Sequence, residues 1–119
     1  MEPQTAMKTA TVLLGIGAIG GVVMALIRFK GAPRPPSTLA MGHGILAAAG
    51  LTLLVYMWAT LGVSSLAQAA TVVLVAAALG GTYINLRYHS QMQPLPIPWV
   101  VAHAGLAVVG FVLLLVAVF

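Results

Sequence analysis

Residues 42–54 read GHGILAAAGLTLL, and residues 102–114 read AHAGLAVVGFVLL. The two segments start 60 residues apart, and the leucine, alanine and glycine positions that follow His43 recur after His103. Aligning residues 8–59 with residues 68–119 without a gap gives 15 identities in 52 positions. Self-similarity at a fixed period is typical of repeat architectures. The sequence therefore predicts a tandem duplication, with repeat 1 at residues 8–59 and repeat 2 at residues 68–119.

The composition indicates an integral membrane protein. Hydrophobic residues make up 61% of the chain and charged residues only 5%, with a mean hydropathy of +1.10. A soluble domain needs more polar surface than this. The chain has no cysteine, which excludes disulfides and thiolate metal sites. We expect residues 1–119 to form a single transmembrane domain in the lipid bilayer that binds no nucleic acid.

Four uncharged runs are long enough to cross a bilayer. They cover roughly residues 9–27, 37–59, 66–86 and 97–119, and about 20 helical residues span the hydrocarbon core. Because backbone groups in lipid must be paired within the segment, each run is expected to be a helix. The first run matches the third in the repeat, so we interpret it as a mature helix and not as a signal peptide. The predicted fold is an all-α membrane four-helix bundle of two helical hairpins, with a pseudo-two-fold axis along the membrane normal.

Basic residues predict the orientation. Arg28, Lys30 and Arg34 lie between the first and second runs and Arg87 between the third and fourth, whereas the opposite side has only Lys8. The positive-inside rule then places both proline-containing loops in the cytoplasm and both termini outside. The expected location is the bacterial inner (cytoplasmic) membrane, with four passes.

The repeat places the two histidines at equal depth. His43 follows Pro36 by seven residues, and His103 follows Pro96 by seven. At the helical rise per residue, both imidazoles lie about 10 Å below the cytoplasmic end of their helices. The second and fourth helices run in the same direction, so on diagonal positions of a bundle the two rings would face each other.

Two facing imidazoles suit the axial ligation of one haem b, with His43 and His103 as the iron ligands. Small residues near the histidines offer space for the flat macrocycle, and Gly50 and Gly110 could let either the ring or a neighbouring helix come close. The same small residues are also normal at helix contacts in membranes without any cofactor. The predicted haem-binding residues beyond the histidines are Ala47, Ala107, Gly50 and Gly110 beside the ring, with Arg28, Arg34 and Arg87 for the propionates.

Other chemistry has little support in the sequence. The only acidic residue is Glu2 in the N-terminal tail, so no carboxylate pair or catalytic triad can form within the helices, and we do not expect an enzyme. We expect His89, in the second cytoplasmic loop, to be interfacial or solvated and not a ligand. Two alternatives stay open: a cofactor-free accessory subunit of a larger membrane complex, and a small transporter or channel.

Four membrane helices with His43 and His103 as a paired set resemble the small four-helix b-type cytochromes and the cytochrome b membrane-anchor subunits of respiratory complexes. The resemblance implies electron transfer between quinol and a partner redox protein, within a larger membrane complex or a homo-oligomer, with quinone as a further partner. Two-haem members of that class need four helix histidines. This chain has two in its apolar runs, so it can hold at most one haem with two histidine ligands.

Overall fold

The computed structural model describes residues 2–119 as four helices and one π turn. The helices are α1 (Pro3–Phe29), α2 (Ser37–Leu61), α3 (Ser65–Ile84) and α4 (Ile97–Val118), and the π turn η1 (Asn85–His89) extends α3. The predicted all-helical four-helix bundle is confirmed. All four helices are long and apolar enough to cross a membrane. The duplication and the membrane insertion stay predictions.

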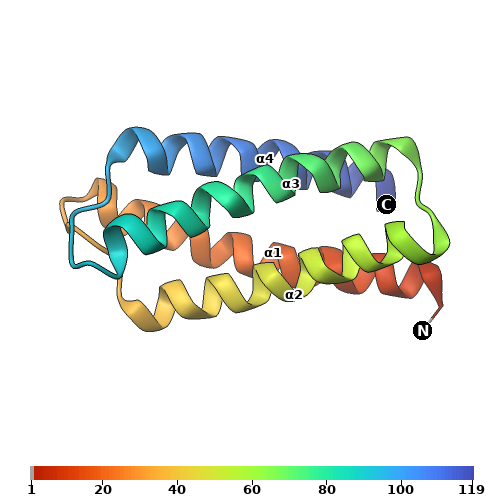
Figure 1. The fold of residues 1–119 in the computed structure, drawn as a ribbon, viewed down its shortest axis with the longest axis horizontal. Helices are drawn as coiled ribbons and strands as arrows, with labels where there is room; N and C mark the ends of the chain where they lie inside the picture. Colours follow the sequence, from red (N-terminus) through yellow and green to blue (C-terminus); the bar gives the residue numbers. More distant parts are fainter. Residues whose placement is uncertain (1) are drawn as a thin grey trace.

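The helices form two hairpins packed side by side. Helix α1 packs against α2 and helix α3 against α4, while α1 also contacts α4 and α2 contacts α3. Helices α2 and α4 therefore occupy diagonal corners of the bundle. In Figure 1 the loops of residues 30–36 and 90–96 lie together at one end, and both termini lie at the other end with the turn that joins α2 to α3. This topology brings equivalent parts of the two hairpins to the same level.

Local sequence explains most helix ends. Pro3 occupies the first turn of α1, where its missing N–H costs nothing, so α1 starts six residues before the predicted run. Gly31 follows α1 with φ 114°, and Gly62 follows α2 with φ 73°. Glycine adopts these positive φ values without a Cβ clash. The Ser64 hydroxyl then caps α3 by accepting a hydrogen bond from the Ala67 N–H at 3.2 Å.

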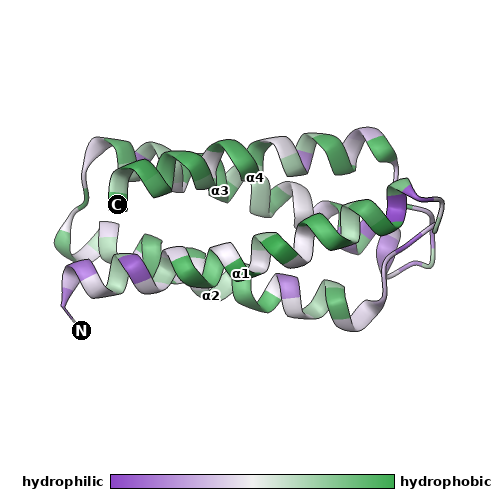
Figure 2. Ribbon diagram, turned by 180° about the vertical axis from the view of Figure 1, so that it is seen from behind, coloured by the Kyte–Doolittle hydropathy of each residue, from purple (hydrophilic) through white to green (hydrophobic). Residues whose placement is uncertain are grey.

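The core consists of two separate hydrophobic clusters. The smaller one, near the loops, contains Ile84, Leu95 and Val100, with Ala25 and Tyr88 packed against it. The histidines belong to neither cluster and lie at the level between them. Figure 2 shows hydrophobic residues over most of the helix surfaces, with hydrophilic residues gathered at the loops and at the N-terminal end of α1. The larger cluster, toward the termini, contains Ala6, Met7, Ala10, Leu14, Leu54, Met57, Ala67, Ala70, Leu74, Leu114 and Val118.

Hydrogen bonds join the two loops into what we call the loop clasp, formed by residues 28–36 with residues 89–95. The Leu95 N–H donates to the Pro33 carbonyl at 3.0 Å, and the Arg28 Nε–H donates to the Leu95 carbonyl at 2.8 Å. The His89 Nε2–H donates to the Pro35 carbonyl at 2.9 Å. His89 is only 7% exposed, so of the two roles expected for it the solvated one was wrong, and the interfacial one stays a prediction. Its buried ring ties the second hairpin to the first loop.

Candidate functional site

The imidazoles of His43 and His103 are each anchored to the other helix of their own hairpin. The His43 Nδ1 lies 2.7 Å from the Gly17 carbonyl oxygen on α1, and the His103 Nδ1 lies 2.7 Å from the Ala77 carbonyl oxygen on α3. A carbonyl can only accept, so Nδ1 carries the proton in both rings. In a neutral imidazole this leaves Nε2 with a free lone pair. Both bonds join residues 26 positions apart.

The two rings lie next to each other between the diagonal helices α2 and α4. Their centroids are 6.2 Å apart and their planes meet at 89°. The expectation that the histidines face each other across the bundle is confirmed by this distance. Within residues 2–119 no buried side-chain nitrogen or oxygen lacks a hydrogen-bond partner.

Glycines on α1 and α3 make room for the rings. A Cβ added at Gly21 would lie 3.0 Å from the His43 Cε1, and one at Gly81 would lie 2.7 Å from the His103 Cε1. The sequence alone did not connect these two glycines with the histidines, because glycines inside apolar helices are typical of helix packing. The available signal was their recurrence at the same offset of 60 residues as the histidines.

Gly50 and Gly110 were expected beside the haem ring, but they lie against leucines of the neighbouring helices. A Cβ at Gly50 would lie 2.7 Å from the Leu14 Cγ, and one at Gly110 would lie 2.8 Å from the Leu74 Cγ. Two roles were considered for these glycines, room for the ring or close approach of a neighbouring helix. The structure shows the close approach of a helix at both positions. Ala47 and Ala107 are half-buried, and the Ala47 backbone nitrogen lies 3.5 Å from the position of a Cβ at Gly17.

The three arginines predicted near the propionates all lie toward the loop end, in different environments. Arg28 is half-buried and uses only Nε in the loop clasp, one of its five N–H donors. Arg34 donates from Nη1 to the Met92 Sδ at 3.1 Å. The Arg87 guanidinium lies 5.1 Å from the centre of the Tyr88 ring. The sole carboxylate side chain, Glu2, precedes α1 at the opposite end of the bundle.

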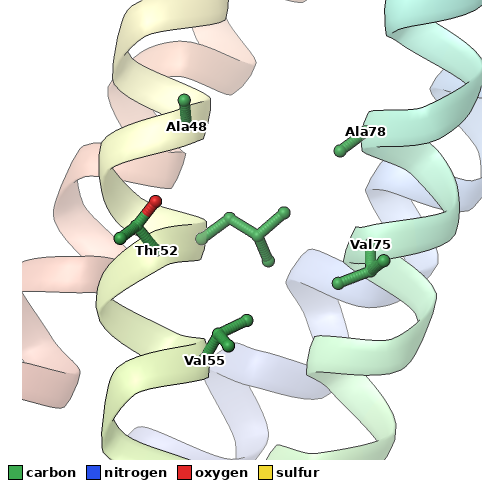
Figure 3. A pocket seen from close by; sticks show the side chains of 6 residues that line it. Ala48, Thr52, Val55, Val75 and Ala78 are labelled. Atoms are coloured by element: carbon green, nitrogen blue, oxygen red, sulfur yellow. The ribbon is translucent and has the colours of Figure 1, made fainter.

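A groove opens between α2 and α3 on the terminal side of the histidine level. Its volume is about 370 Å³, and Figure 3 shows its side chains projecting from the two helices toward a common space. Thr52 contributes the one polar side chain of the lining. Ala78, on the α3 wall, directly follows the residue whose carbonyl holds His103. The lining residues are Ala48, Leu51, Thr52, Val55, Val75 and Ala78.

Neither a cluster of metal ligands in the described residues nor a match among known proteins indicates the function of this chain. Across residues 2–119 no group of three or more His, Cys, Asp or Glu side chains could hold a metal ion. No protein-family model matches the chain, and no curated protein or solved structure is similar to it. The candidate site therefore rests on its own geometry.

Proposed function

We propose that this protein is a membrane electron-transfer protein that binds one haem b between His43 and His103. The observation that carries the proposal is the pair of imidazoles on diagonal helices, each with Nδ1 donating to a backbone carbonyl. Metal-binding histidines commonly donate their second ring N–H to a carbonyl, because the bond selects the tautomer and orients the ligating nitrogen. Here the same bond occurs in both halves of the bundle.

The separation of the rings suits an iron between them. A metal–imidazole bond is about 2 Å long and the ring centre lies about 1 Å further on, so two axial imidazoles have centroids about 6 Å apart. The distance of 6.2 Å between His43 and His103 agrees with this value. Porphyrin supplies the remaining four ligands, so a pair of histidines suffices where no third ligand is present.

Small residues are concentrated at the level where the macrocycle would lie. The two hydrophobic clusters end on either side of the histidines, and α1 and α3 carry Gly20-Gly21 and Gly80-Gly81 there. A Cβ at Gly80 would meet nothing within 4 Å. When bound, haem would supply a one-electron carrier that alternates between the ferric and ferrous states.

The distribution of basic residues supports an orientation of the protein in the membrane and indicates the end toward which haem propionates would point. We propose that the loop end faces the cytoplasm of a bacterium and that both termini face outward, because the loops carry nearly all the cations. Carboxylates of a haem pointing toward the loops could pair with Arg28 and Arg34 at the loop end. Arg87 is exposed and suits lipid headgroups at the same surface.

A partner is proposed for each side of the electron transfer. The groove between α2 and α3 opens laterally, and its small apolar lining suits a quinone dissolved in the bilayer. The other partner would be a redox subunit of a respiratory complex, or a second copy of the chain in a homo-oligomer.

Titration with haem tests the proposal. The purified protein should bind haem b with a break at one haem per chain, and His43→Ala or His103→Ala should abolish that break. The matched control is His89→Ala, which removes a histidine outside the pair and should still bind one haem. If the His43→Ala and His103→Ala variants bind haem as the wild type does, the proposal is wrong.

A second function, an accessory subunit without cofactor, is favoured by open glycines on the outer helix faces. Gly42 and Gly44 on α2 and Gly105 on α4 would each meet nothing within 4 Å if they carried a Cβ. Exposed small residues allow a helix of another membrane protein to approach closely. For this function, Gly44→Leu or Gly105→Leu would prevent co-purification of the partner complex, and the histidine variants would not.

A further inference from the structure

We infer that Gly21 and Gly81 are positioning residues for the two imidazoles, and that they hold the ring planes perpendicular to each other. The inference deepens the proposed haem function and rests on it for its spectroscopic consequence. Each glycine lies one helical turn after the carbonyl that accepts the Nδ1–H of the same ring, at Gly17 or Ala77. A ring is thus held at two points by one helix.

The distances show that no side chain fits between either ring and its helix. A Cβ at Gly81 would lie 2.7 Å from Cε1 and 3.3 Å from both ring nitrogens of His103. At Gly21 the corresponding distances to His43 are 3.0 Å to Cε1, 3.3 Å to Nδ1 and 3.9 Å to Nε2. An alanine at either position requires the imidazole to shift or rotate, which would lengthen the 2.7 Å hydrogen bond.

These two glycines differ from an ordinary helix-packing glycine. The atoms nearest to a Cβ at Gly17 belong to the α2 backbone and to Leu46, which is typical of close helix contact. At Gly21 and Gly81 the three atoms of other residues nearest to the added Cβ all belong to an imidazole. The histidine ring therefore occupies the space that a side chain at Gly21 or Gly81 would fill.

The angle between the ring planes matters for the iron. Each axial imidazole donates π electrons to the iron d orbital perpendicular to its own plane. Parallel planes act on one orbital and split the pair in energy, whereas perpendicular planes act on both and leave them nearly equal. If haem were bound with the 89° angle kept, ligation by two imidazoles would make the ferric iron low-spin, and the perpendicular planes would give it a strongly anisotropic EPR signal. Ligand orientation is one of the ways in which a protein tunes haem.

Four single variants provide the test. Gly21→Ala and Gly81→Ala place a methyl group against a ring, whereas Gly80→Ala meets nothing within 4 Å and Gly20→Ala meets no atom closer than 3.8 Å. All four changes raise helix propensity alike, so this effect cancels. Gly21→Ala is the milder of the two changes and provides a second reading if Gly81→Ala does not fold.

EPR of the ferric protein is the first readout. Wild type, Gly20→Ala and Gly80→Ala should give the strongly anisotropic low-spin signal. Gly21→Ala and Gly81→Ala should give a rhombic low-spin or a high-spin signal, with haem affinity lowered about tenfold or more. If Gly21→Ala and Gly81→Ala keep the wild-type signal and affinity while haem still binds to His43 and His103, the positioning role is wrong and the haem proposal stands.

Nitrogen NMR of histidine-labelled protein without haem is the second readout. The wild type and the Gly80→Ala control should show both helix imidazoles with the proton on Nδ1, and Gly81→Ala should release His103 into a mixture of tautomers. Release of His103 in Gly81→Ala would support the positioning role. If the wild-type protein also failed to bind haem, the haem proposal would be overturned while the positioning role stands. Unchanged tautomers in Gly81→Ala would overturn the positioning role.

Discussion

The carbonyl oxygens of Gly17 and Ala77 determine which nitrogen of each imidazole is available. Both accept a hydrogen bond from Nδ1 at 2.7 Å, and in a neutral ring this leaves Nε2 with the free lone pair. Sequence comparison of the two halves predicted the histidine pair, because an identical residue at an offset of 60 is visible in the chain. It did not predict the carbonyl partners, because every residue carries a carbonyl and only the helix packing selects one.

At the scale of single residues, His89 provides a prediction about stability. His89→Ala leaves the Pro35 carbonyl without its donor in a buried place, and the cost should be about 1–3 kcal/mol in the free energy of unfolding. Denaturant titration in detergent, followed by circular dichroism, measures it. The exposed Gln93→Ala variant is the control. Equal stability of the two variants would show that the buried bond to Pro35 contributes nothing.

At the scale of elements, the two helices of each hairpin pack closely where a leucine of one helix lies against a glycine of the other. Gly50 on α2 lies against Leu14 on α1, and Gly110 on α4 lies against Leu74 on α3. Close approach of the backbones at these points explains why both leucines are buried. Small residues at such contacts increase van der Waals packing between membrane helices, where the hydrophobic effect contributes little.

Enlarging Gly110 should weaken the second hairpin. In Gly110→Ala the new Cβ would lie 2.8 Å from the Leu74 Cγ and 3.3 Å from the Leu74 backbone nitrogen, and overpacking of this kind costs about 1–3 kcal/mol. On the same helix, Gly105→Ala would meet nothing within 4 Å and should be neutral or slightly stabilising. The free energies of unfolding of the two variants decide between these outcomes. Gly110→Ala as stable as Gly105→Ala would contradict this packing.

The helices could be predicted from the sequence, but the π turn that extends α3 could not. The four apolar runs predicted all four helices, because the length of an uncharged run is a strong signal. The π turn Asn85–His89 was not predicted, since its five residues have no periodicity of their own. The Ser90 N–H bonds to the Asn85 carbonyl at 2.8 Å, and His89 is buried against the first loop. Long-range contacts of this kind leave no pattern in the local sequence.

At the scale of the whole molecule, the two hairpins are joined at both ends, with the histidine pair between the two junctions. The loop clasp joins them at one end, and the larger hydrophobic cluster joins them toward the termini. The layer between contains the histidines and the glycines of α1 and α3. A molecule fixed at both ends can keep the two imidazoles in register.

The topology of the bundle can be tested with single cysteines, because the chain has none of its own. Ser37→Cys and Ser90→Cys lie at the loop end, and Ser65→Cys lies at the end with the termini. All three serines are exposed. In intact cells a membrane-impermeant thiol reagent should label only Ser65→Cys, and opening the membrane should expose the other two. Labelling of Ser37→Cys and Ser90→Cys from opposite sides would contradict a bundle of two equivalent hairpins.

The most direct test of the central claim is the visible spectrum of the purified protein in its oxidised and dithionite-reduced forms. For the wild type and for His89→Ala, we expect a sharp reduced α-band at the position typical of b-type cytochromes. For His43→Ala and for His103→Ala, we expect this band to be lost. A folded, helical wild-type protein that stays colourless after haem is supplied would contradict the claim that the paired imidazoles are haem ligands.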